Sequence, residues 1–284
     1  MRKALFNPIQ HGFTLIEAII VIVITGIIAT MVAVFIRSPV DGYIDSVARA
    51  ELTDAADAAL RRMARDVHAA LPNSLRTTTG GSNSCFEFLP TVGGGRYRVA
   101  QSNTGTGDVL DFSTSDTSFD VLASSNLPPP GGYATLHHAV IYNLGIAGAD
   151  AYDVTNLNRA AIGAASTAAN VTLVPGNRFP FQSPSMRFQV IPDLSVVYSC
   201  DGMTSTLRRS TRAITAATLD ACPSGGVGTA LVANVDCANT VFTYTPFVSQ
   251  RNGLLTMTLV LTQPGSHGPE TIRLYQEVHV DNTP

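Results

Sequence analysis

The sequence lacks the short motifs that carry catalysis or metal binding in many families. None of its serines stands in a G-x-S-x-G turn, and no lysine follows Gly93-Gly94-Gly95, so that run predicts a flexible turn instead of a phosphate loop. His137-His138 would point to opposite faces of a strand and could not readily share a metal. Asp108 and Asp111 leave calcium as an alternative, without the dense oxygen ligands of a recognised loop. We therefore expect no catalytic site, no cofactor and no metal.

Basic residues are also scarce, and Lys3 is the only lysine. The net charge is −3, with 18 basic and 21 acidic residues. Loss of Arg2 and Lys3 would leave 16 basic residues against 21 acidic residues, a net charge of −5. Nucleic-acid binding usually requires a basic patch, so we expect no nucleic-acid partner.

The chain has no C-x-x-C pair, so its cysteines favour disulfides over a zinc site. The four cysteines are Cys85, Cys200, Cys222 and Cys237. All lie after the N-terminal apolar run, and delivery of this part outside the inner membrane would let disulfides persist. An even count favours two disulfides, with three possible pairings that the sequence leaves open. Reduced buried thiols are the remaining alternative.

Residues 13–36 form a long apolar run in which Glu17 is the only ionisable side chain. As a helix this run is long enough to cross the ~30 Å hydrocarbon core of a membrane. An unpaired charge near the centre of the bilayer would cost about 2.5 to 3.5 kcal/mol. We expect Glu17 to have a partner, although a carboxylate near a helix end could also reach the headgroups.

A short polar leader precedes this run, with Arg2, Lys3 and Pro8, and it ends in Gly12. A secretory signal peptide would instead carry its small-residue cleavage site after the apolar segment. The sequence from Gly12 to Glu17, GFTLIE, resembles the type III signal of type IV prepilins and type II secretion pseudopilins. The resemblance implies cleavage between Gly12 and Phe13 by prepilin peptidase, methylation of the new amino terminus at Phe13, and pairing of Glu17 with the amino terminus of an adjacent subunit.

The rest of the chain predicts a second, amphipathic helix and a β-rich region. Apolar residues recur at helical spacing from Val47 to Leu71, after a kink or break at Ser38-Pro39 and before Pro72-Asn73. We expect a leader at 1–12, a transmembrane or filament-core helix at 13–36, its amphipathic continuation at 37–72, and a β-rich periplasmic head at 73–284. Short alternating runs separated by Gly, Pro, Ser and Asn indicate an antiparallel sheet, with a final hairpin and a short helix around 159–169.

These elements predict an α+β fold in which a long N-terminal helix packs on an antiparallel head, as in pilins. The segments 48–67 and 85–91 resemble the MSHA biogenesis protein O family and the W-type and J-type minor pilins. The resemblance implies a non-enzymatic minor pilin that takes part in assembly of a type IV, MSHA-like pilus as a priming or tip subunit. Its partners would be prepilin peptidase, other major and minor pilins, and the inner-membrane assembly platform.

The implied location is the bacterial inner membrane, as a single-pass protein with a cytoplasmic N-terminus and a periplasmic head, and then the filament. Two alternatives stay open: a type II secretion pseudopilin, and a filament-borne adhesin or binding module. A membrane-tethered periplasmic enzyme would need a convergent polar cluster that the sequence does not show.

Overall fold

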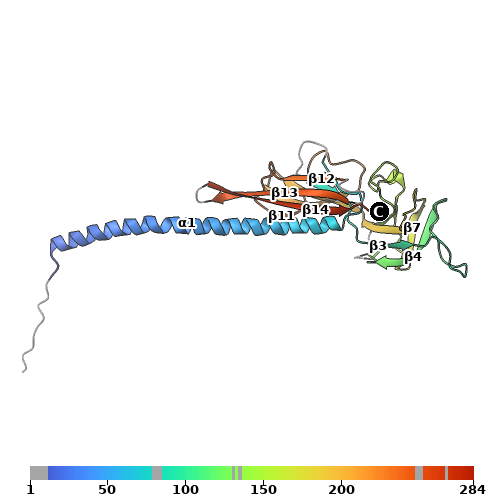
Figure 1. Cartoon of the computed structure of the whole chain (residues 1–284), viewed down its shortest axis with the longest axis horizontal. Helices are drawn as coiled ribbons and strands as arrows, with labels where there is room; N and C mark the ends of the chain where they lie inside the picture. Colours follow the sequence, from blue (N-terminus) through green and yellow to red (C-terminus); the bar gives the residue numbers. More distant parts are fainter. Residues whose placement is uncertain (1–11, 79–84, 130–131, 134–135, 247–251, 266–267) are drawn as a thin grey trace, which may run out of the picture. The chain divides into compact units, whose positions relative to one another are not determined.

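The computed structural model describes residues 12–78, 85–129, 132–133, 136–246, 252–265 and 268–284. The chain divides into two compact units, one of residues 1–50 with 264–270 and the other of residues 51–263 with 271–284. One long N-terminal helix is followed by antiparallel strands, as the sequence predicted (Figure 1). The α+β fold class is therefore confirmed.

Helix α1 (Leu15–His68) contains 54 residues and runs through Pro39 without ending there. Of the kink or break predicted at this proline, the break is therefore wrong, and the helix continues through it. A proline inside a helix removes one N–H donor and crowds the preceding turn, so it weakens a helix without necessarily ending it. In the smaller unit, Arg49 of α1 forms an ion pair with Glu270 at 2.8 Å.

The helix ends at His68, a few residues before the predicted stop at Pro72. Beyond this point the backbone no longer forms helical hydrogen bonds and instead pairs with residues 89–91. The N–H of Leu71 donates to Leu89 O at 2.7 Å, and the N–H of Thr91 donates to Ala69 O at 2.7 Å. This pairing satisfies backbone groups that the end of a helix leaves open.

The strands form three sheets. The first contains β1 (Arg76–Thr77), β2 (Cys85–Phe88), β9 (Leu194–Asp201), β10 (Thr206–Ala213) and β11 (Thr229–Val232), in that order. The second contains β12 (Val241–Thr245), β13 (Asn252–Gly265) and β14 (Gly268–Asp281). The third runs in the order β6 (Arg159–Ala161), β5 (His137–Val140), β8 (Arg187–Pro192), β3 (Gly93–Tyr97), β4 (Asp116–Ser125) and β7 (Asn170–Asn177).

The main core lies between the second half of α1 and the first two sheets. Leu52, Ala56, Leu60 and Met63 of the helix are buried there with side chains of β2, β9, β13 and β14. Asp66 adds a polar contact on the same helix, because it accepts hydrogen bonds from Tyr198 Oη at 2.7 Å and Arg209 Nε at 2.9 Å. The helical spacing in this part of α1 therefore does bury one face, as the sequence predicted.

A separate core fills one face of the six-stranded sheet, around Tyr97, Phe119, Phe179 and Phe188. A third, smaller cluster contains Leu71 and Leu89 together with Val140, Tyr152 and Ile191.

Two sequence predictions fail in the six-stranded sheet. Gly93-Gly94-Gly95 is not a turn but the start of β3, between β8 and β4. A Cβ at these positions would lie 2.5 to 2.7 Å from backbone oxygens of the neighbouring strands, so glycine allows the close approach. The helix expected around 159–169 is also absent, since β6 begins that segment, and the only short helix described nearby is the 3-10 turn η1 (Val154–Asn156).

Candidate functional site

The first turn of α1 starts at a helix cap that the sequence analysis missed. The N–H of Glu17 donates to Thr14 Oγ1 at 3.3 Å, and helix α1 begins at Leu15. Thr14 and Glu17 have the T-x-x-E spacing of a capping box, the signal that could have revealed this cap. A carboxylate in the first turn also interacts favourably with the helix dipole. Glu17 therefore has a local structural role in addition to any role between subunits.

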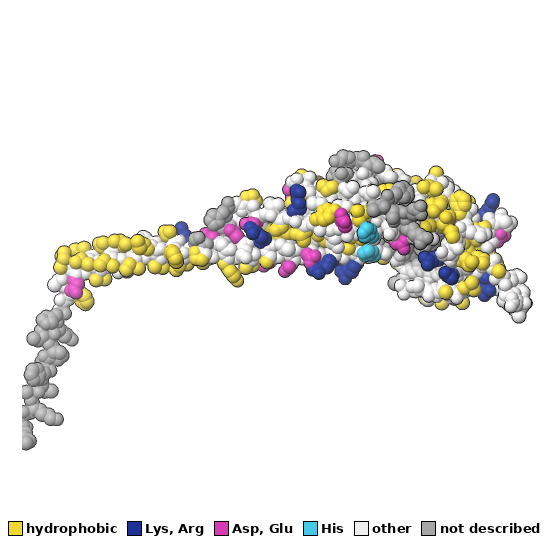
Figure 2. Space-filling model, viewed as in Figure 1, with side chains coloured by type: hydrophobic (Ala, Val, Ile, Leu, Met, Phe, Trp, Pro, Cys, Tyr) yellow, Lys and Arg dark blue, Asp and Glu magenta, His cyan; other side chains and the backbone are white. Residues whose placement is uncertain are grey.

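Among the described residues, none covers the apolar part of α1. Its 18-residue window of mean hydropathy 3.0 is entirely unburied, and it is the one helix among the described residues that could cross a membrane. Figure 2 shows hydrophobic side chains along this part of the helix. Residues 15–36 would extend about 33 Å as a helix, which is close to the thickness of the hydrocarbon core.

The two threonine hydroxyls inside this segment are satisfied by the helix itself. Thr25 Oγ1 donates to Val21 O at 2.7 Å, and Thr30 Oγ1 donates to Ile27 O at 2.8 Å. A hydroxyl bonded in this way adds no open donor to an apolar environment. Together with the apolar surface, these bonds fit a segment that lies in lipid or among other apolar helices.

The predicted cleavage position lies just before the helix. Gly12 and Phe13 precede α1 in a non-helical segment, and Phe13 is 82% exposed. A Cβ at Gly12 would meet nothing within 4 Å. The leader positions Arg2, Lys3 and Pro8 lie outside the described residues. The peptide bond between Gly12 and Phe13 is thus open to a protease, while its actual cleavage stays a prediction.

Residues 7–33 match the prokaryotic N-terminal methylation motif. The N-terminal segment is therefore a type IV pilin-like prepilin signal, and it supports a pilin or pseudopilin. Joined to the single apolar helix, this signal suggests membrane anchoring. Comparison with curated proteins found no similar sequence, and comparison with solved structures found no similar fold.

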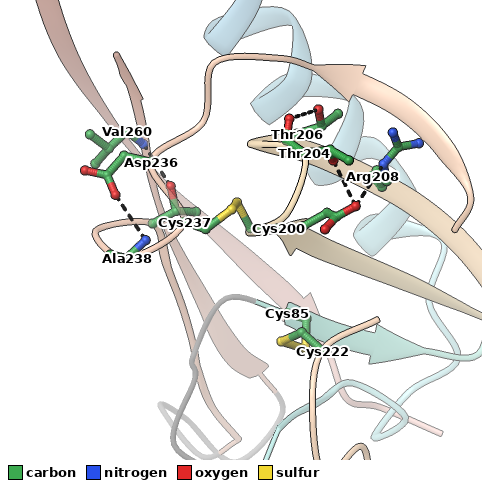
Figure 3. Close-up of a disulfide and its surroundings, with 12 residues drawn as sticks. Cys85, Cys200, Thr204, Thr206, Arg208, Cys222, Asp236, Cys237, Ala238 and Val260 are labelled. Atoms are coloured by element: carbon green, nitrogen blue, oxygen red, sulfur yellow. Dashed lines mark hydrogen bonds and ion pairs between the residues drawn. A yellow bond between two sulfur atoms is a disulfide. The ribbon is translucent and has the colours of Figure 1, made fainter. Parts of the chain in front are cut away.

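The predicted pair of disulfides is confirmed in the β-rich part of the chain, and one of the three possible pairings is realised. Cys85 is bonded to Cys222, with 5.6 Å between their Cα atoms, and Cys200 is bonded to Cys237, with 5.5 Å (Figure 3). Cys85 and Cys200 belong to β2 and β9, neighbours in the five-stranded sheet. Each disulfide thus joins that sheet to a later connection. Cys85–Cys222 binds the connection before β11, and Cys200–Cys237 binds the connection after it.

Asp201, next to Cys200, forms a buried hydrogen bond with the connection before β11. The residue is fully buried, and it accepts hydrogen bonds from Thr204 Oγ1 and from the N–H of Gly226, both at 2.8 Å. Burial raises the pKa of this carboxyl, but the hydrogen bonds outweigh burial and leave the pKa at about 2. The ionised form of Asp201 is therefore the form that fits this site.

The remaining candidates from the sequence make local contacts. Asp108 Oδ2 accepts from Ser118 Oγ at 2.6 Å, and Asp111 accepts from the hydroxyls of Ser113 and Thr114. The imidazole of His138 contacts Asp193 at 2.9 Å, and burial lowers its pKa although Asp193 opposes this. In the part of the chain that the structure describes, no three His, Cys, Asp or Glu side chains gather as a metal site.

Proposed function

We propose that this chain is a minor pilin or pseudopilin that prepilin peptidase cleaves after Gly12 and that then enters a type IV pilus-like filament. The observation that carries the proposal is the methylation motif at residues 7–33, placed on the only exposed apolar helix among the described residues. The new amino terminus at Phe13 is methylated, and the apolar half of α1 moves from the membrane into the filament core. The chain acts with other pilins and the inner-membrane assembly platform and has no enzymatic activity.

The same proposal gives Glu17 its partner. Inside the apolar core of a filament, an unpaired carboxylate would be costly, and the amino group at Phe13 of an adjacent subunit neutralises it. This pairing also sets the register between neighbouring helices. A role in an MSHA-like pilus, as a priming or tip subunit, rests on the resemblance of segments 48–67 and 85–91 to minor pilins of that kind.

Replacement of Gly12 by valine tests the processing step. The side chain meets nothing within 4 Å, so the variant should fold normally. We expect Gly12→Val to keep its leader in cells that contain prepilin peptidase, as seen by N-terminal sequencing and intact mass. Gly26→Ala is the matched control, since a Cβ there also meets nothing within 4 Å, and it should mature normally. Maturation of Gly12→Val to the wild-type mass would refute cleavage at this position.

A second pair of variants separates the capping role of Glu17 from its pairing role. Thr14→Ala removes the hydroxyl that caps α1 but keeps the carboxylate. Glu17→Ala removes the carboxylate and keeps the cap acceptor. We expect Glu17→Ala to insert into the membrane but to be nearly absent from sheared filaments, while Thr14→Ala is incorporated. Equal incorporation of both variants would rule out pairing through Glu17.

A further inference from the structure

Strand β3 brings two arginines together on the outer face of the six-stranded sheet. In the antiparallel pairing of β3 with β8, Arg96 lies directly opposite Arg187, and Gly94 lies opposite Gln189. Directly paired residues share a face of a sheet, as do residues two positions apart on one strand. Phe188 and Val190, which alternate with these residues, are buried in the core of the opposite face. Arg96, Arg187 and Gln189 therefore face away from that core.

A shallow groove of about 300 Å³ lies at this place, between β4 and β8, strands that flank β3 (Figure 1 labels β3 and β4). Glycine forms its floor, because a Cβ at Gly94 would lie only 2.7 Å from Phe188 O. Its rim residues are Arg96, Ala123, Ser125, Arg187 and Gln189. The groove thus exposes the glycine backbone of β3 beside the side chains of Arg96 on the same strand, Arg187 on β8, and the small residues of β4.

The two arginines are unusual because their charges are not matched. Both residues are exposed, and within the described part of the chain neither guanidinium forms an ion pair or donates a hydrogen bond. Like charges directly opposite each other on neighbouring strands weaken a sheet. Arg159 shares their face, and burial lowers its pKa, but Asp193, Asp150 and Asp153 lie near enough to oppose this shift with negative charge. The unmatched positive charge therefore belongs to Arg96 and Arg187.

Gln189 adds an unused acceptor beside this pair. Its Oε1 atom is buried and has no hydrogen-bond donor in the structure. A buried polar atom without a partner is costly, and such atoms are rare in folded proteins. The groove thus presents guanidinium donors for a carboxylate, and Gln189, two residues from Arg187 on the same face, offers an acceptor for an N–H group once its side chain turns toward the groove.

We propose that this groove, formed by Arg96, Arg187, Gln189 and the glycine floor, binds an acidic peptide segment of a partner protein. A peptide with Asp or Glu supplies both groups that the groove lacks: a carboxylate for the arginines and a backbone N–H for Gln189. A phosphodiester chain supplies the anion without that backbone N–H, and a polyuronate offers hydroxyl donors in its place. The two arginines, paired directly across β3 and β8, are placed to form charge-assisted hydrogen bonds with one or two carboxylates of such a peptide.

The test measures binding of fluorescent hexaglutamate, capped at both ends, to the full chain in detergent. Hexaglutamine of the same length is the neutral probe, and oligothymidylate and oligogalacturonate are the other two anions. We expect hexaglutamate to bind more tightly than all three and to bind more weakly at high salt. Hexaglutamine binding as tightly as hexaglutamate would overturn the proposal. Tighter binding of either other anion would overturn the peptide assignment.

Variants locate the binding site. Arg96→Gln with Arg187→Gln should weaken hexaglutamate binding at least about tenfold, in line with two charge-assisted hydrogen bonds. Removal of the repulsion between them should leave the melting temperature unchanged or higher. Arg62→Gln with Arg65→Gln is the matched control, because it removes two exposed arginines of α1 outside the groove. Equal losses in the two double variants would overturn the site.

Two further variants keep the site testable without a change in its charge. Ala123 is exposed and lies opposite Arg96 on β4, so Ala123→Trp should fill the groove and block hexaglutamate. Gln189→Leu removes the unpaired acceptor and should weaken hexaglutamate binding while it leaves the fold intact. Wild-type affinity in both variants would overturn the groove as the binding place. A negative result in these binding tests would not bear on cleavage after Gly12, which is measured on a different segment.

Discussion

Arg212 holds Glu87 through two parallel contacts, from Nε to Oε1 at 2.8 Å and from Nη2 to Oε2 at 3.0 Å. Glu87 is fully buried, and Arg76 approaches its Oε2 from the other side at 2.9 Å. The guanidinium of Arg76 also lies 3.5 Å from the ring centre of Tyr152 and donates to Thr215 O and Ala217 O. Glu87 of β2 thus joins β1 and β10, and its two arginine partners also bind the connection after β10.

Glu87→Gln should strongly destabilise the β-rich region. Removal of one member of a buried ion pair leaves its partners uncompensated and costs about 3 to 5 kcal/mol. Asp57→Asn is the matched control, because the Asp57–Arg61 ion pair is exposed and should contribute less than about 0.5 kcal/mol. Urea unfolding of the full chain in detergent, followed by near-UV circular dichroism, measures both. A similar shift in the two variants would contradict the proposed difference.

The two disulfides should contribute unequally. Cys85–Cys222 closes a separation of 137 residues, whereas Cys200–Cys237 closes 37. The chain-entropy model then gives about 5 and about 4 kcal/mol. We expect the Cys85→Ser, Cys222→Ser double variant to unfold at a lower urea concentration than the Cys200→Ser, Cys237→Ser variant. The reverse order would show that strain or residual structure outweighs loop length.

The sequence predicted the parts of the fold in which the local pattern and the tertiary structure agree. Alternating runs predicted antiparallel strands such as β13, in which Leu255, Met257 and Leu259 are buried, and helical spacing predicted the packed half of α1. Strand β10 was missed because Arg208, Arg209 and Arg212 give it a polar composition. Among the described residues, their charges are paired with Asp201, Asp66 and Glu87, which come from elsewhere in the chain.

The candidate site shows the same limit. GFTLIE could be recognised because its residues are consecutive, whereas the disulfide pairing depends on which strands become neighbours. The groove at Arg96 and Arg187 could not be found from sequence, since its residues meet only through the register of β3 with β8 and β4.

The glycines of β3 should be far less tolerant of substitution than a glycine in an open turn. A Cβ at Gly95 would lie 2.5 Å from Ala123 O and 3.0 Å from a ring carbon of Phe188. Gly95→Ala should therefore cost about 1 to 3 kcal/mol through forced backbone shifts. Gly202→Ala is the control, since a Cβ there meets nothing within 4 Å. A neutral Gly95→Ala variant would show that β3 and β4 can separate without cost.

Asp201 should make the protein sensitive to acid. Its pKa is about 2 in the folded chain against an ordinary value of 3.8, because hydrogen bonds from Gly226, Thr204 and Met203 outweigh the effect of burial. A carboxyl whose pKa is lower in the folded state stabilises that state fully above its unfolded pKa. This contribution is lost as the pH falls from about 4 to about 2. The urea midpoint of the wild type should therefore fall across this window.

Asp201→Asn should have a lower urea midpoint at neutral pH and a flatter acid dependence, because the amide does not titrate. Asp111 also has a pKa of about 2, held there by hydrogen bonds from Ser113 and Thr114, so it titrates in the same window. Asp111→Asn, alone and combined with Asp201→Asn, separates the two contributions. If Asp201→Asn keeps the full wild-type slope while Asp111→Asn removes it, the acid sensitivity belongs to the surface turn at Asp111 and not to the buried carboxylate beside Cys200.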